Sequence, residues 1–185
     1  MNMKKAFAIL LCLAMMLGCS AMAETAEKTY LATVDLNGVF RLQANLPEGY
    51  EVTVIETMSE ENPSYIAQFI AGDTRPMLQL SVAYNELYSE VARMNDLDAE
   101  SLAWIEGTFR AEDDVDISYT ETAYGTKLMA VREKEGTVDY VDFYTIYLGY
   151  EVEIAVVAAD AETGLTEEQI QMAVDFLSDL DFVAP

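Results

Sequence analysis

The order and spacing of apolar residues predict an α+β domain, in which an antiparallel sheet packs against helices. Apolar and polar side chains alternate in most segments, as in strands with one buried face. Helical spacing of apolar residues interrupts this alternation twice. Short connections rich in glycine or proline separate the strands, and such connections require antiparallel pairing. We therefore expect about six to eight strands packed against two to three helices.

Four strands are predicted in the first part of the domain. Residues 40–46 alternate apolar and polar side chains, and the following Pro47-Glu48-Gly49 is typical of a turn. The next three strands are expected at residues 50–57, 64–71 and 77–84, which alternate or are rich in β-branched residues.

Helical spacing then replaces alternation in the middle of the chain. Apolar residues recur every three or four positions over residues 87–94 and 102–109. Asp98 is suited to cap the second of these helices, because its carboxylate accepts backbone N–H groups. Further strands are predicted at residues 115–123, 126–134, 137–148 and 150–159, separated by glycines.

The last predicted helix has the clearest start. Thr166 and Gln169 have the spacing of a capping box, in which the threonine oxygen accepts a backbone N–H and the glutamine side chain reaches back. Apolar residues from Ile170 to Leu180 then recur on one helical face. We expect this face to cover the sheet.

The N-terminus has the pattern of a secretory signal peptide over residues 1–23. Two lysines precede an apolar run, residues 6–17, which is shorter than the roughly 20 residues of a membrane-spanning helix. The sequence AMA before Glu24 is typical of cleavage and release. The sequence LGC ending at Cys19 resembles a lipoprotein motif, so the alternative is lipid anchoring of Cys19 at the outer face of the cytoplasmic membrane.

Composition indicates one acidic domain. Residues 36–183 have the length of a single domain after a disordered tether at 24–35, and we expect a monomer. Ten basic and 33 acidic residues give a net charge of −23, which disfavours nucleic acid and anionic lipid. The chain has no histidine, and both cysteines lie in the signal peptide. Catalysis by histidine or cysteine and zinc sites built from them are therefore excluded for the mature domain.

An acidic run after the second helix is a candidate cation site. Glu112, Asp113, Asp114 and Asp116 bring four carboxylates close together in the sequence, and calcium prefers such oxygen ligands. The alternative is a solvated acidic loop, which is the reading we prefer. No other cofactor is indicated.

Aromatic residues crowd the last predicted hairpin. Alternation predicts that Tyr140, Tyr144 and Tyr150 share one face, with Phe143 and Tyr147 on the other. One face must belong to the core, and the first three tyrosines are the candidate interaction surface.

Two further features have alternative interpretations. Trp104, the single tryptophan, is expected to pack partly on the core, and sugar stacking is the alternative. Lys127, Arg132 and Lys134 are expected to pair across strands with Glu151 and Glu153.

The chain resembles the PsbP-like family of α/β/α sandwich proteins. The resemblance is carried by FRLQANLPEGYEV, by GTKLMAVREKEGTVDYVDFYTIYLGYEVEIAVVA and by TEEQIQMAVDFLSDLDF, with Leu180 and Phe182 as the closing apolar pair. It implies an accessory or binding role outside the cytoplasm and supplies no catalytic motif.

We therefore expect a non-catalytic binding module, at the cell envelope or outside the cell, for an unidentified protein or envelope component. The alternatives are a glycan hydrolase that uses an Asp/Glu pair and a calcium-binding protein.

Overall fold

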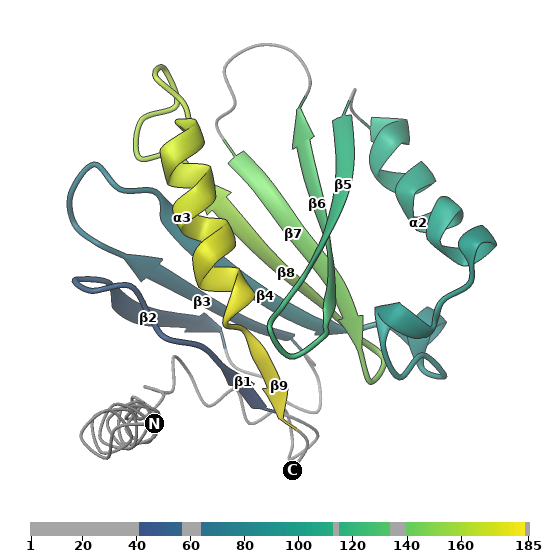
Figure 1. The fold of residues 1–185 in the computed structure, drawn as a ribbon. Coiled ribbons are helices and arrows are strands. Elements are labelled where there is room, and N and C mark those ends of the chain that lie inside the picture. Colours follow the sequence, from purple (N-terminus) through teal and green to yellow (C-terminus); the bar gives the residue numbers. More distant parts are fainter. Residues whose placement is uncertain (1–40, 57–63, 113–114, 134–139, 184–185) are drawn as a thin grey trace, which may run out of the picture.

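The computed structural model of the chain describes residues 41–56, 64–112, 115–133 and 140–183 (Figure 1). Seven of its strands are β2 (Glu51–Glu56), β3 (Ser64–Ile70), β4 (Met77–Tyr84), β5 (Val115–Glu121), β6 (Lys127–Glu133), β7 (Tyr140–Tyr147) and β8 (Tyr150–Val157). They form one sheet in the order β2-β3-β4-β8-β7-β6-β5, and every neighbouring pair is antiparallel. The predicted α+β class and the antiparallel sheet are confirmed.

A separate two-stranded sheet joins the two ends of the domain. The first strand, β1 (Arg41–Gln43), pairs with β9 (Asp181–Val183), and Leu42 lies opposite Phe182. The sequence predicted the first strand as part of a longer segment and did not predict β9. Three residues are too few for a clear alternation, so only their long-range pairing makes β9 a strand.

Helix α3 (Glu167–Ser178) covers one face of the large sheet, as Figure 1 shows. Its buried residues Ala173, Phe176 and Leu177 join a core cluster with alternate residues of β3, β4, β7 and β8. The predicted capping box is present. Gln169 N donates to Thr166 Oγ1 at 3.2 Å, and Thr166 N donates to Gln169 Oε1 at 2.9 Å.

Helix α2 (Ala99–Glu112) packs at the β5–β6–β7 end of the sheet, against the opposite face. Its Ile105 joins Met94, Met129, Val131 and Ile146 in a second core cluster. Val131 of this second cluster pairs with Asp142 on β7, so the two side chains lie on the same face of the sheet. The neighbours of Asp142 on β7, Val141 and Phe143, belong to the first core cluster and point to the other face. The two helices therefore lie on opposite sides of the sheet.

The helix predicted over residues 87–94 is absent. In its place are two short 3-10 turns, η1 (Glu86–Tyr88) and η2 (Met94–Asp96). The β7–β8 turn explains the difference, because Gly149 N donates to the carbonyl of Val91 and Leu148 N donates to that of Ala92. Arg93 is extended there, with φ of −148° and ψ of 150°, and forms an antiparallel bridge with Tyr147, so a helix cannot run through this residue.

Several sequence predictions lie outside the described residues: the signal peptide at 1–23, Cys19, the tether at 24–35, Asp113 and Asp114. In the ranges that the structure does describe, no helix is both long and apolar enough to cross a bilayer.

Candidate functional site

An open apolar hollow lies between α2 and the segment that carries η1 and η2. We call it the α2 hollow; its volume is about 440 Å³. Its apolar wall consists of Leu87, Tyr88, Val91, Leu97, Trp104 and Ile105. Asp98, Glu100 and Ser101 complete the lining, in which no residue is basic.

The wall is unusual because large apolar side chains in it face solvent. Ile105 is 2% exposed and belongs to the second core cluster, whereas its neighbour Trp104 is 57% exposed. Successive helical residues project about 100° apart, so one points into the core and the other outward. Leu87 on η1 is 75% exposed. The expected core packing of Trp104 is thus replaced by a position at the wall of the hollow.

The acidic residues of the α2 hollow lie at the start of α2. Ser101 N donates to Asp98 Oδ1 at 2.8 Å, which confirms the predicted cap. This bond and further hydrogen bonds to Ser101 and Glu100 hold the pKa of Asp98 below its usual range. Asp98 is therefore ionised at neutral pH. Glu100 adds a second carboxylate in the first helical turn, where the helix dipole favours negative charge.

A hydrogen-bonded chain of side chains leads from the hollow to the sheet. The Tyr88 hydroxyl is hydrogen-bonded to that of Tyr144, and the Tyr144 hydroxyl donates to Glu151 Oε1 at 2.9 Å. Tyr144 is buried, and this burial, followed by the charge of Glu151, raises its pKa. Both tyrosines therefore remain neutral and serve as hydrogen-bonding groups.

Beyond this chain, two carboxyl groups meet on the sheet face that α2 adjoins. Tyr144 pairs with Glu153 and Asp142 with Ala155, so Asp142 and Glu153 are diagonal neighbours on β7 and β8. Their side chains are hydrogen-bonded. Burial, and then the charge of Glu153, raise the pKa of Asp142 to about 7, while burial raises the pKa of Glu153.

A carboxyl pair with a raised pKa is one requirement of glycosidase chemistry, but the geometry here differs. The two carboxylates of a glycosidase flank the sugar at roughly 5–10 Å. Asp142 and Glu153 instead bond to each other, and neither lines the α2 hollow. This arrangement allows the carboxyl groups of Asp142 and Glu153, on neighbouring strands, to share one proton.

The three tyrosines proposed as one surface do not share a face. Tyr147 and Tyr150 lie directly opposite each other across the two-residue Leu148-Gly149 turn, so both point into the first core cluster. Tyr144 is buried on the other face, and Tyr140 is half-buried there. The prediction of a common face is wrong, because it continued the alternation of one strand through the turn.

The basic residues of β6 also have partners other than those predicted. Arg132 Nη2 lies 2.8 Å from Glu167 Oε1 at the start of α3, and Lys127 Nζ lies 5.8 Å from the centroid of the Tyr119 ring. Pairing with Glu151 or Glu153 is excluded because β7 separates β6 from β8. Lys134 lies outside the described residues.

Only part of the acidic run is described. Glu112 ends α2, and Asp116 is exposed on β5 opposite Arg132. Among the described residues, no three Asp, Glu, His or Cys side chains are grouped so as to hold a metal ion.

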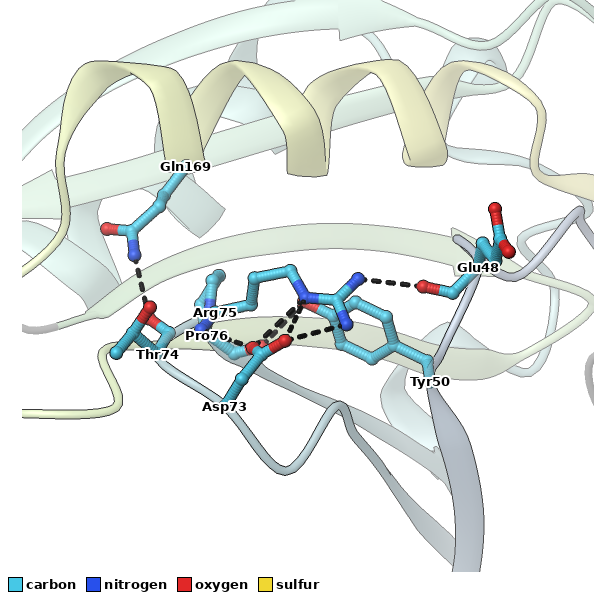
Figure 2. A network of polar contacts seen from close by, with 7 residues as sticks. All are labelled: Glu48, Tyr50, Asp73, Thr74, Arg75, Pro76 and Gln169. Carbon is cyan, nitrogen blue, oxygen red and sulfur yellow. Dashed lines mark hydrogen bonds and ion pairs between the residues drawn. The ribbon is translucent and has the colours of Figure 1, made fainter.

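A further polar cluster surrounds Arg75, which sequence analysis did not single out (Figure 2). Arg75 Nη1 donates to the carbonyl of Glu48 at 2.7 Å, and Arg75 Nε donates to both carboxylate oxygens of Asp73 at 3.0 Å. The guanidinium also lies 5.0 Å from the Tyr50 ring centroid. Gln169 at the start of α3 donates to a carbonyl in the same loop. Because the guanidinium is used within the fold, we assign this cluster a structural role.

Comparison with protein-family models, with characterised proteins and with solved structures gives no match to this chain.

Proposed function

We propose that this protein is an exported, non-catalytic binding module and that the α2 hollow is its ligand-binding surface. The observation that carries the proposal is the exposure of both Trp104 and Leu87 in the wall of one apolar hollow. Single exposed apolar residues are ordinary, but a hollow lined by several of them is typical of binding sites.

The energetics support the same interpretation. Removing a leucine-sized side chain from water stabilises it by about 1.5–3 kcal/mol. In the free protein this stabilisation is largely unrealised for Leu87 and Trp104. A ligand that covers both side chains recovers it, and the well-packed Ile105 beneath them supplies a rigid base.

The remaining features support export and a role without catalysis. The signal-peptide pattern of residues 1–23, with Cys19 as the alternative anchoring site, supports a place outside the cytoplasm. The absence of histidine from the sequence removes the usual general base. The position of α2 and α3 on opposite sides of the sheet supports a PsbP-like α/β/α arrangement.

Intact mass of the protein made from the full chain in a bacterial host tests export. A mature start at Glu24 is expected for release, and a diacylglycerol-modified Cys19 for anchoring. Retention of residues 1–23 in a protein that accumulates in the cytosol would contradict export.

Fluorescence of the single tryptophan tests the binding surface. The neutral aromatic probe N-phenylnaphthylamine is expected to bind saturably and to quench Trp104 by energy transfer. Leu87→Ser should weaken this binding about tenfold, because an apolar contact of leucine size is lost. The control is Ile55→Ser, which removes an exposed apolar side chain on β2. Equal affinity of both variants for the probe would show that the α2 hollow is not the site.

A further inference from the structure

We propose that the ligand of the α2 hollow is a basic polypeptide segment, with an apolar side chain in the hollow and Lys or Arg side chains against the surrounding acidic residues. This inference rests on the proposed function and specifies the chemistry of the ligand.

The charge around the hollow is predominantly negative. Between Asn85 and Ser101 the chain has five acidic residues and one basic residue. Glu86 and Glu90 are exposed on either side of the wall residues Leu87 and Tyr88, and Asp98 and Glu100 lie at the other side. The basic residue, Arg93, is directed to the Tyr147 ring, 5.8 Å from its centroid. These acidic residues around the hollow favour cationic partners and disfavour anionic ones.

The apolar surface continues beyond the hollow. The Leu148-Gly149 turn is hydrogen-bonded to Val91 and Ala92, so exposed Leu148 adjoins the wall of the hollow. Exposed Tyr84 packs against the same turn, since a Cβ on Gly149 would lie 3.2 Å from its ring. An apolar surface that extends past a single hollow fits a chain segment better than a compact small molecule.

The conformation of Leu148 gives independent support. Its φ is +50°, in the left-handed region where Asn or Gly is favoured and leucine is strained. Leu148 is also 37% exposed, so part of this apolar side chain remains open to solvent. Strained residues that persist in this way often belong to binding sites.

Three ten-residue peptides, added to the full chain and followed by Trp104 fluorescence and by calorimetry, test the inference. They alternate Leu with Lys, Leu with Glu, and Ser with Lys. We expect the Leu/Lys peptide to bind at least tenfold more tightly than the other two. Its affinity should fall several-fold between about 0.02 and 0.5 M salt, because ions screen exposed pairs.

Variants then separate the two contributions. Glu100→Gln should weaken binding of the Leu/Lys peptide about twofold to fivefold, as expected for an exposed ion pair. Glu162→Gln, the same change in an exposed loop outside the hollow, is the control and should have no effect. Leu148→Asn should weaken binding while raising the melting temperature, because Asn suits the turn. A merely structural Leu148 would leave the affinity unchanged.

The outcomes distinguish this inference from the proposed function. If N-phenylnaphthylamine binds but the affinity of the Leu/Glu peptide equals or exceeds that of the Leu/Lys peptide, the proposal of a cationic ligand is wrong. The proposal that the α2 hollow binds a ligand is then unaffected. If the Ser/Lys peptide binds as well as the Leu/Lys peptide, binding is due to the general negative charge of the protein and not to the α2 hollow, and the inference is overturned. If neither the probe nor any peptide binds, both are wrong.

Discussion

Asp142 keeps its proton up to near-neutral pH because it is buried and because its partner across the strands is another carboxyl group. Its pKa is raised from 3.8 to about 7 by burial and by Glu153. Between these two values the folded state binds a proton that the unfolded state releases. The contribution of Asp142 to the free energy of unfolding therefore falls as the pH rises through this window.

Replacing this group tests the sign of that dependence. Asp142→Asn should raise the free energy of unfolding by about 1–2 kcal/mol near pH 8, a value reduced because the group is only half-buried. Near pH 5, which lies about a third of the way through the window, the increase should be about a third as large. Urea denaturation across this range measures the effect. Asp116→Asn, at an exposed carboxylate on β5, is the control. Parallel pH profiles for the wild type and Asp142→Asn would contradict the assignment.

Replacement by alanine is expected to change the stability of the fold in opposite directions at two glycines. Gly49 has φ of +82°, and a Cβ there would lie 2.9 Å from Arg75 Nη2, so Gly49→Ala should destabilise the fold by about 1–3 kcal/mol. Gly107 lies within α2 and has no atom within 4 Å of an added Cβ. Gly107→Ala should stabilise the fold by about 0.5–1 kcal/mol. Thermal denaturation of both variants measures the difference, and equal shifts would refute the account of the turn.

Helix α3 depends on its first turn, because the capping box and the Gln169 contact to the Arg75 loop lie there together. Thr166→Ala removes the oxygen that accepts Gln169 N and should cost about 1 kcal/mol in the free energy of unfolding. Thr166→Ser keeps that oxygen and should recover most of the loss. Chemical denaturation measures both variants, and equal losses would show that the cap is not responsible.

The β7–β8 hairpin shows how a turn limits prediction from alternation. Within each strand, alternation correctly separates the residues of the two faces. Across the turn, however, Tyr147 and Tyr150 are paired and their side chains lie on the same face. Which residues of β8 share a face with those of β7 therefore depends on the register between the two strands. The misplacement of Tyr150 thus has a geometric cause. Residues 87–94 were similarly misassigned, because Arg93 is extended and pairs with Tyr147 beside this turn.

The acidic charge affects the protein as a unit. A net charge of −23 opposes the compact state by self-repulsion, and added salt screens it. We expect the melting temperature to rise with sodium chloride, and millimolar calcium and magnesium to raise it equally. A calcium-specific rise would favour the calcium-binding alternative, because a ligand specific to the native state stabilises it.

The amino-acid sequence alone determined the features that depend on near neighbours. Alternation identified the strands of the large sheet, Asp98 and Thr166 marked the starts of both helices, and composition removed histidine chemistry. These signals are local, because hydrogen bonds and side-chain faces repeat over a few residues.

Only the tertiary structure decided the candidate site. The α2 hollow combines Leu87 with Trp104, and the carboxyl pair joins Asp142 to Glu153 across two strands. The pairing of β1 with β9 likewise joins the two ends of the domain. Each of these depends on how distant segments pack, and the same periodic pattern describes a buried apolar residue and an exposed one until the neighbouring element is in place.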